Sequence, residues 1–517
     1  MRDLIAAIER ARDKTSDKYR VEAVQRQHER GKLTARERID LLCDPGTFRE
    51  MGRLVEPARD NEFNMAIQAP ADAVVTGWGL SQGRPIMVAA SDYTVMGGST
   101  GAIGRQKIVR SAKRAGEAGM PFIMLHDGGG HRIQDGQDAR SFAYGTPIFN
   151  VLAQLSGWVP IIAGIMGPAF AGPTQYSALA DLVVMIRGRS AMGMAGPALV
   201  KAAIGEDISI EELGGAKMHS DISGIAHLAV DDEQSCIKAI KDYLSYLPSN
   251  AQQSLPILDV GDSRERRDEA LLDIVPTNTR QVYDVNKVID HVVDKKSRFD
   301  IQPTYARNLA TCFARLDGKP VGIIANQPKH QGGMLDTKAC EKGAHFIAVC
   351  DAFGLPLIYL MDVPGSAIGS VAERTGLGRR NGRMLYELGC STVPRITVVL
   401  RKGYGGGYVV MNGGTSFESD ASLIWPTAEI CAMSIEGSVD VAFRRDYESA
   451  ADPAARRSEL IAKIRSQTGP LRAAEHFYID DVIDPRDTRS WLIDILRVAQ
   501  PRRRSSPHPR YRSISPV

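Results

Sequence analysis

The chain has 517 residues, of which 43% are hydrophobic and 24% are charged, with a formal net charge of +3. The length predicts two to four globular domains, and the composition excludes a chain that is disordered throughout. The positive charge comes from residues 495–517, which hold six arginines and no acidic residue, so the charge does not favour nucleic-acid binding by the fold.

The cysteines and the apolar stretches further limit the class of protein to which the chain can belong. The seven cysteines include no C-x-x-C pair, which argues against a disulfide framework or a zinc site and favours a reducing, cytoplasmic setting. The start of the chain is an amphipathic helix pattern without the apolar core of a signal peptide. Residues 141–180 carry no charge, but four prolines interrupt them, and no apolar run reaches the ~20 residues of a membrane span. We expect neither a membrane segment nor a metal centre.

The first half begins with helices over residues 1–45. Thr34, followed three residues later by Glu37, predicts a capping box at the start of one of these helices. Short strands are predicted at 74–78 and 86–90, and they are followed by a glycine-rich loop and an amphipathic helix. This plan is typical of an α/β unit.

Two glycine-rich breaks follow in the first half. A strand at 122–125 leads into HDGGGHRIQDG, and residues 159–176 read VPIIAGIMGPAFAGPTQY. The second segment predicts a buried strand and a tight turn into a helix, where bare backbone N–H groups face outward. Such a turn can hold negative charge.

The second half follows a polar linker that ends near residue 275 and repeats this plan. It predicts a helix at 337–352, a strand at 357–362, and the segment VPRITVVLRKGYGGGYVVM over 393–411. The tail at 496–517 is rich in Pro, Ser and Arg, which predicts disorder.

The repetition has a fixed offset of 235 residues. Eight residues recur at this offset: Gly97, Gly98, Lys107, Gly119, Pro121, Leu125, Asp127 and Gly130 match Gly332, Gly333, Lys342, Gly354, Pro356, Leu360, Asp362 and Gly365. Matched Gly and Pro positions imply matched backbone turns, so we infer an internal duplication. The two aspartates follow strands and are interpreted as turn caps.

The chemistry of the chain is predicted to come from backbone amides. The sequence has no G-x-x-x-x-G-K-[ST] or H-E-x-x-H motif. Two glycine-rich turns, one per half, can each stabilise an oxyanion, and one such donor contributes roughly 3 to 4 kcal/mol. The alternative is that the glycines only permit close packing of strand and helix. The duplication favours the first interpretation, because a reaction between two carbonyl compounds needs two such sites.

These segments, with GKLTARERIDLL, SDYTVMGGS, VGIIANQP, MDVPG and WPTAEI, resemble the carboxyltransferase (β) subunits of biotin-dependent acyl-CoA carboxylases, the propionyl-CoA carboxylase group. The similarity covers about residues 20–495. It implies an α/β fold of two tandem crotonase-like domains and a homo-hexamer whose active sites lie between the first half of one subunit and the second half of another.

The resemblance also implies the reaction. A carboxyl group moves from carboxybiotin, carried on a separate subunit with biotin carboxylase and carrier functions, to the α-carbon of an acyl-CoA through enolates. It implies oxyanion donors at Ala171 and Gly172 for the thioester and at Gly406 and Gly407 for biotin. We assign substrate binding to the following residues: Gly98, Gly129, Gly130, Gly365 and Val409. No metal is assigned to this subunit, and fatty acid metabolism is the expected setting.

Several residues depart from the family pattern. The first turn has Ala171, Gly172 and Pro173 where the family has two glycines and an alanine, and Pro173 has no N–H to donate. Val409 stands where short-chain enzymes carry Asp, which suggests a larger or branched acyl group. His131 replaces an alanine.

We therefore predict an acyl-CoA-side domain at 1–260, a carboxybiotin-side domain at 261–495 and a basic tail at 496–517. Two alternatives remain open. One is the carboxyltransferase of a biotin-dependent acyl-CoA decarboxylase with a membrane partner. The other is a non-catalytic structural paralogue, motivated by Ala171 and Pro173. We expect no nucleic-acid partner and no direct membrane contact.

Overall fold

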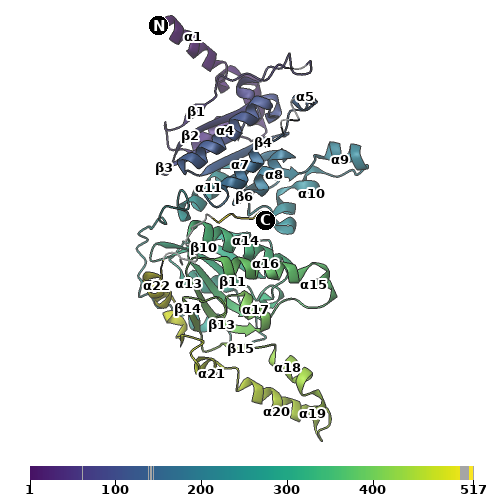
Figure 1. The fold of residues 1–517 in the computed structure, drawn as a ribbon, viewed down its shortest axis with the longest axis vertical. Helices are drawn as coiled ribbons and strands as arrows, with labels where there is room; N and C mark the ends of the chain where they lie inside the picture. The colour runs from purple at the N-terminus through teal and green to yellow at the C-terminus, as the bar shows by residue number, and fades with distance from the viewer. Residues whose placement is uncertain (61, 138, 140–142, 144, 501–511, 516–517) are drawn as a thin grey trace. The chain divides into compact units, whose positions relative to one another are not determined.

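The computed structural model describes all residues except 61, 138, 140–142, 144, 501–511 and 516–517. The chain divides into two compact units (Figure 1). Unit 1 is Met1–Gln253 with Tyr511–Val517, and unit 2 is Ser254–Arg510. The linker residue Leu258 already belongs to unit 2, where its N–H donates to the carbonyl of Gly318 at 3.2 Å.

Unit 1 contains an eight-stranded sheet in the order β1-β2-β3-β4-β5-β6-β8, with β7 paired to β5. The β1–β2 and β2–β3 pairs are antiparallel and the others parallel. The strands are β1 (Arg49–Met51), β2 (Val74–Ser81), β3 (Arg84–Ser91), β4 (Phe122–Gly128), β5 (Ile161–Phe170), β6 (Leu182–Ile186), β7 (Ala191–Gly193) and β8 (Leu228–Val230). The helices are α1 (Arg2–Asp13), α2 (Val21–Glu29), α3 (Ala35–Leu42), α4 (Ala102–Ala118), α5 (Ile133–Gly136), α7 (Ile148–Leu155), α8 (Gly172–Ala178), α9 (Pro197–Ile204), α10 (Ile210–Gly214) and α11 (Glu233–Tyr246), with the short turns η1 (Asp17–Tyr19), η2 (Pro70–Ala73), η3 (Met96–Gly98) and η4 (Met218–Ser223).

Unit 2 repeats this sheet in the order β9-β10-β11-β12-β13-β14-β16, with β15 paired to β13. The strands are β9 (Phe299–Ile301), β10 (Leu309–Leu316), β11 (Lys319–Asn326), β12 (Leu357–Val363), β13 (Arg395–Tyr404), β14 (Ala421–Ile424), β15 (Glu429–Cys431) and β16 (Asp481–Val482). The helices are α12 (Leu271–Ile274), α13 (Val285–Val292), α14 (Thr337–Phe353), α15 (Ser370–Arg374), α16 (Leu377–Cys390), α17 (Gly405–Val410), α18 (Ile435–Ala442), α19 (Arg444–Glu448), α20 (Pro453–Arg465), α21 (Pro470–Ala474) and α22 (Thr488–Val498), with η5 (Gln331–Gly333) and η6 (Pro485–Asp487). The matching strand orders confirm the predicted duplication.

Equivalent helices follow the third strand of each sheet. Both α4 and α14 have 17 residues, and both end at a glycine in the left-handed conformation, Gly119 and Gly354, with φ angles of 61° and 80°. α14 is buried over most of its length and packs against the 14-residue α16. α4 packs against the shorter α7 and keeps much of its polar face exposed. The uncovered face of α4 leaves room for a cavity in unit 1.

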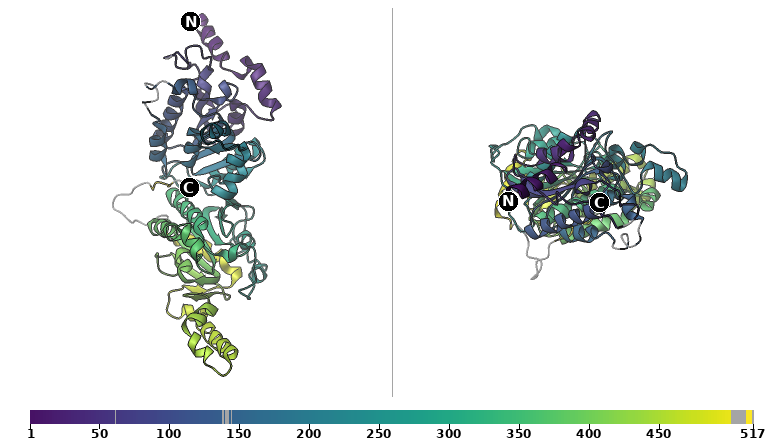
Figure 2. Two further views of the ribbon diagram at one scale, coloured as in Figure 1. Left: turned by 90° about the vertical axis from the view of Figure 1, so that its right-hand side faces the viewer. Right: turned by 90° about the horizontal axis from the view of Figure 1, so that it is seen from above.

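Two of the helices near the N-terminus, α3 and α1, differ in how they are held in place. Thr34 caps α3 with a complete capping box, because its hydroxyl accepts from the Glu37 amide and Glu37 accepts from the Thr34 amide. α1 buries no residue and extends away from the rest of unit 1 (Figure 2).

The structure describes only parts of the predicted tail at 496–517. α22 continues to Val498, and Ile514 is buried and exchanges two hydrogen bonds with the Ser156 hydroxyl in unit 1. Residues 501–511 lie outside the described part of the chain.

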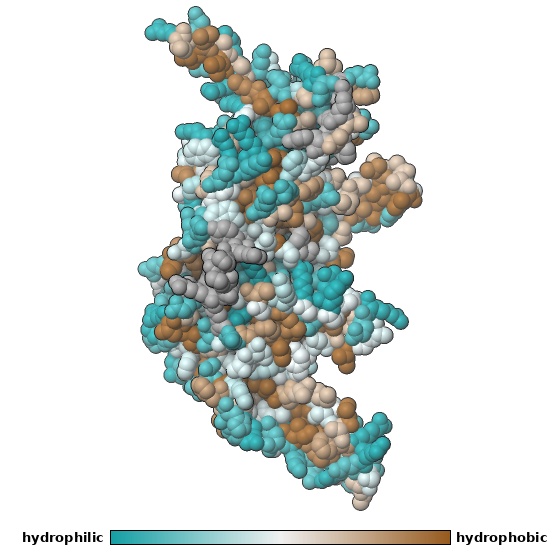
Figure 3. Space-filling model, in the orientation of Figure 1, coloured by the Kyte–Doolittle hydropathy of each residue, from teal (hydrophilic) through white to brown (hydrophobic). Residues whose placement is uncertain are grey.

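One apolar helix of unit 1 stays exposed. Apolar side chains gather on α9 (Figure 3), where Leu199 and Ile204 are 61% and 72% exposed. Within the described residues, no helix combines the length and apolarity needed to cross a bilayer.

Candidate active site

The first glycine-rich turn joins the central strand β5 to α8. Ala171, between them, has φ 59° and ψ −117°, a conformation that L-amino acids rarely adopt. Its N–H donates to the carbonyl of Gly193 in β7 at 2.8 Å. The Thr174 hydroxyl also bonds to Gly193, so β7 holds the turn in place.

The available amide of this turn belongs to Gly172. Within the described residues the Gly172 N–H, at the first position of α8, has no acceptor, and the next residue, Pro173, has no N–H. The amide of Ala171 is already bonded, contrary to the donor role predicted for it. Gly172 is the amide of this pair that an oxyanion can reach.

Gly130 lies against the same turn. A Cβ added to Gly130, whose φ is 87°, would lie 2.7 Å from the Phe170 carbonyl and 3.8 Å from the Pro173 ring. The carbonyl of Gly130 accepts a hydrogen bond from the Thr100 amide at 2.8 Å. Gly129, its neighbour, is exposed with open space around it. Gly129 and Gly130, two of the predicted substrate-binding residues, therefore lie beside the first turn.

Gly98 packs closely against the backbone of Asp127 and Gly128, just before this loop. It has φ 70°, and a Cβ there would lie 2.1 Å from the Asp127 carbonyl, so only glycine fits. Gly98 is buried and packs on the loop rather than facing solvent. His131, the replaced alanine, contacts the guanidinium of Arg105 on α4.

A cavity of about 600 Å³ opens beside the first turn in unit 1. This volume is in the range of small-molecule sites. Tyr176, four residues after Gly172 on α8, forms part of its wall, and three basic side chains of α4 line it: Arg105, Arg110 and Lys113. Sequence reasoning did not single out Tyr176, although its spacing from Gly172 places both on one helix face.

The second turn joins β13 to α17 in unit 2. Gly405 has φ 57°, Gly406 is exposed, and Gly407 is buried. Within the described residues the amides of Gly406 and Gly407 have no acceptor. A Cβ on Gly407 would lie 3.0 Å from the Cα of Gly365, so Gly365 lies against this turn as Gly130 does against the first. Val409, on α17, is half-buried.

Each turn is backed by a buried carboxylate. Asp127 pairs with Lys32 at 2.5 Å and with Arg38 at 2.9 Å, and Asp362 pairs with Arg401 at 3.0 Å. Both aspartates have no exposed surface. The predicted turn-cap role is thus incomplete: Asp362 accepts from the Lys402 amide, but both carboxylates mainly anchor buried cations.

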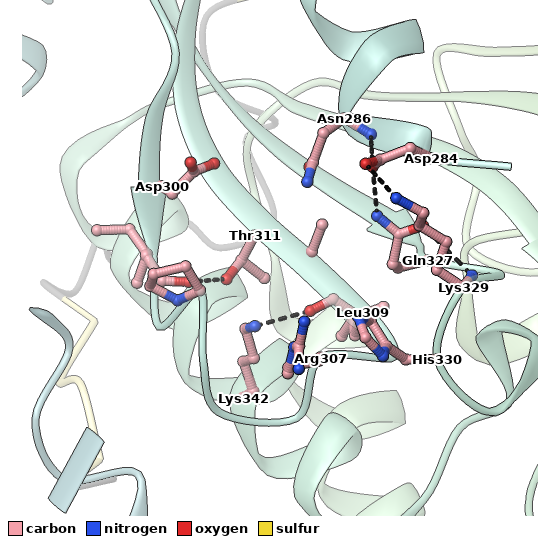
Figure 4. A pocket seen from close by; sticks show the side chains of 13 residues that line it. Asp284, Asn286, Asp300, Arg307, Leu309, Thr311, Gln327, Lys329, His330 and Lys342 are labelled. Carbon is pink, nitrogen blue, oxygen red and sulfur yellow. Dashed lines mark hydrogen bonds and ion pairs between the residues drawn. The ribbon is translucent and has the colours of Figure 1, made fainter. Parts of the chain in front are cut away.

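A separate pocket of about 170 Å³ lies in unit 2 (Figure 4). Lys342 extends along its wall and donates to the carbonyls of Gln302, Tyr305 and Leu309 at 2.7–2.9 Å. Its counterpart Lys107 likewise donates to two carbonyls in unit 1. The repeated lysines tie a helix to the loops beside it, and the residues of the second turn do not line this pocket.

The chain thus consists of two equivalent α/β units, each with a bare amide at a strand-to-helix turn, the kind of group that can bind an oxyanion. The carboxyl transferase domain family matches residues 26–514. The chain belongs to this family, the carboxyltransferases of biotin-dependent acyl-CoA carboxylases, which confirms the predicted fold and enzyme class.

Individual relatives agree with this assignment. The chain is 40% identical over 516 residues to a propionyl-CoA carboxylase carboxyltransferase subunit of Haloferax mediterranei, covering 99% of each chain. It is 40% identical over 480 residues to the methylmalonyl-CoA decarboxylase subunit alpha of Veillonella parvula, covering 93% of this chain and 92% of the other. The crystal structure of hexameric transcarboxylase 12S with methylmalonyl-coenzyme A bound superposes with a TM-score of 0.92 at 38% identity, covering 100% and 98%.

Among the described residues, no group of three His, Cys, Asp or Glu side chains is arranged to hold a metal ion.

Proposed function

We propose that this chain transfers a carboxyl group from carboxybiotin to the α-carbon of an acyl-CoA, using one backbone turn for each enolate. The C–N bond of carboxybiotin breaks and a C–C bond forms at the α-carbon. The α-proton passes to the ureido group of the leaving biotin. The observation that carries the proposal is the pair of equivalent turns with bare amides, Gly172 in unit 1 and Gly406 in unit 2.

The first turn holds the thioester oxygen in this proposal. Gly172 supplies an amide at the start of α8. Gly129 and Gly130 form the loop that faces this amide, and Gly98 packs against the backbone that precedes the loop. Negative charge on the thioester oxygen develops as the enolate forms, so a fixed amide stabilises the transition state more than the ground state.

The second turn holds the biotin oxygen. Gly406 and Gly407 supply amides, and Gly365 lies against them. Leaving biotin carries its charge on the ureido oxygen, which two amides can stabilise without a side-chain base or a metal. Val409 on the same helix is the residue that we assign to acyl selection, with preference for a larger or branched acyl group.

The cavity beside the first turn suits coenzyme A. Its basic side chains on α4 match the phosphates of the cofactor moiety, and its volume accommodates an acyl-pantetheine arm. The proposal further includes a biotin carboxylase and carrier partner subunit, a homo-hexamer as in the 12S protein, and a cytoplasmic setting in fatty acid metabolism.

The test is the half-reaction with purified protein, free biotin and a panel of malonyl-CoA, methylmalonyl-CoA and larger carboxylated acyl-CoAs. Mass spectrometry follows the decarboxylated product. Biotin-dependent turnover is expected, and the fastest ester names the acyl group. Measurable binding of CoA esters without turnover would overturn the proposal and favour the non-catalytic paralogue.

The reverse direction is a second candidate, because the decarboxylase subunit from Veillonella parvula is as similar to this chain as the carboxylase subunit. Reconstitution of the chain with candidate partner subunits distinguishes the forward reaction from the reverse one. ATP-dependent acyl-CoA carboxylation with a biotin carboxylase and carrier supports the forward reaction. Capture of a membrane decarboxylase partner without ATP-dependent carboxylation supports the reverse one.

A further inference from the structure

A tyrosine hydroxyl lies beside the bare amide of the first turn. A Cβ added to Gly172 would lie 3.0 Å from the hydroxyl oxygen of Tyr176. Because Cβ is roughly 2.5 Å from the nitrogen of the same residue, the hydroxyl and the Gly172 amide lie at most about 5.5 Å apart. Two donors that share one acceptor at about 2.9 Å each can be up to about 5.8 Å apart. One oxygen atom can therefore accept from both groups.

The Tyr176 hydroxyl has no hydrogen-bond partner among the described residues. Tyr176 is 7% exposed. Its ring packs against Phe149 and His126, with ring centroids 5.3 and 6.3 Å away. Tyr176 also lines the cavity assigned to acyl-CoA. A ligand in this cavity can accept a hydrogen bond from the hydroxyl.

The second turn shows the complementary arrangement. The position of Pro173 is taken there by Gly407, which keeps its N–H, and the position of Tyr176 is taken by Val410, which has no donor. Unit 1 thus lacks one amide and has one hydroxyl, and unit 2 has the amide and lacks the hydroxyl.

We propose that the Tyr176 hydroxyl donates the second hydrogen bond to the thioester oxygen, together with the Gly172 amide. This role rests on the proposed carboxyl transfer and adds a catalytic side chain to a site otherwise built from backbone. No proton is transferred: the hydroxyl donates a hydrogen bond that strengthens as charge develops on the oxygen.

The surroundings keep the hydroxyl a donor. Burial raises the pKa of Tyr176 above its ordinary value, and the nearby Arg105 guanidinium acts in the opposite direction. The phenol therefore stays protonated at neutral pH.

The kinetic test uses a double-mutant cycle in the biotin-dependent half-reaction. Tyr176→Phe removes the hydroxyl alone, and we expect kcat to fall about 100-fold with KM for the acyl-CoA nearly unchanged. Pro173→Ala restores an amide, so Tyr176→Phe should cost at most about tenfold in that background. Tyr243→Phe, a buried tyrosine of the same unit whose hydroxyl bonds to the Asp181 carbonyl, is the control and should keep kcat.

A wild-type kcat in Tyr176→Phe would overturn the proposal. So would an equal loss in the Pro173→Ala background, because a packing role does not depend on the amide at residue 173.

The spectroscopic test does not need turnover. Acyl-CoA labelled with ¹³C at the thioester carbonyl is bound to wild type and to Tyr176→Phe, and the carbonyl stretch is measured by infrared difference spectroscopy. We expect a band shifted to lower frequency in wild type and a smaller shift in the variant. Identical bands would overturn the role of Tyr176, whereas absent turnover with distinct bands would overturn only the proposed carboxyl transfer.

Discussion

Ala171 and Gly405 occupy the same position in the two turns, 234 residues apart, and share a left-handed backbone with φ angles of 59° and 57°. Glycine adopts this conformation without a steric penalty, and alanine does not. The first turn therefore stores backbone strain at Ala171, and the second turn avoids it at the equivalent Gly405.

Ala171→Gly should stabilise unit 1. Relief of a strained residue is worth roughly 1 kcal/mol or more, which corresponds to a rise in Tm of about 2–4 °C. Gly405→Ala is the matched reverse change and should lower Tm, because its Cβ would also lie 2.8 Å from the Ala432 carbonyl. Scanning calorimetry measures both variants. A lower Tm for Ala171→Gly would show that the turn is not strained.

The duplication could be predicted because the residues that repeat are those that fix the backbone or fill buried polar positions. Gly119 and Gly354 both end a helix in the left-handed conformation, and Lys107 and Lys342 both tie a helix to nearby carbonyls. Such residues keep their identity when the surrounding surface changes, so the repeat stays visible in the sequence.

The fine geometry of the first turn could not be predicted. An alanine carries no sequence signature of a positive φ, and the bond from Ala171 to Gly193 depends on the pairing of β5 with β7. Tyr176 was within reach of sequence reasoning, since an aromatic hydroxyl four residues after Gly172 lies on the same face of a predicted helix. The glycine pattern that marks the turn carries no signal for this side chain, because Tyr176 lies within the helix that follows.

Gly407→Pro should nearly abolish the half-reaction. Proline removes one of the two amides of the second turn, and the loss of one such donor lowers kcat about 100-fold or more. Gly407→Ala is the matched control, because it adds the same Cβ beside Val363 and Gly365 but keeps the N–H. Equal rates for the two variants would remove Gly407 from the oxyanion site, since their difference isolates the amide.

Val409→Asp should shift the acyl preference toward short chains. Val409 is half-buried on α17, and a carboxylate there disfavours contact with a larger apolar acyl group. The ratio of kcat/KM for larger esters to that for malonyl-CoA should fall about tenfold. Val409→Asn separates the charge from the loss of apolar surface. An unchanged ratio in both variants would place the acyl group away from Val409.

Asp181→Asn should remove one component of the pH dependence of stability. Asp181 is 2% exposed; one carboxyl oxygen accepts from the Ile161 amide at 2.9 Å, and the other has no partner within the described residues. Burial raises the pKa of Asp181 to about 8, and the bond from the Ile161 amide acts in the opposite direction. The folded state thus holds a proton that the unfolded chain releases near pH 4.

The sign of the effect follows from this difference in proton binding. The contribution of Asp181 to stability is fully present below about pH 4 and is lost as pH rises to about 8. Asn is neutral at every pH and keeps the acceptor for Ile161, so Asp181→Asn should match wild type in Tm at pH 4 and exceed it by about 5 °C at pH 8. Asp420→Asn, which alters the equivalent acceptor of the Arg395 amide in unit 2, is the control for a general effect of removing a carboxylate. Parallel curves of Tm against pH for wild type and Asp181→Asn would mean that Asp181 is ionised in the folded protein, with water satisfying its second oxygen.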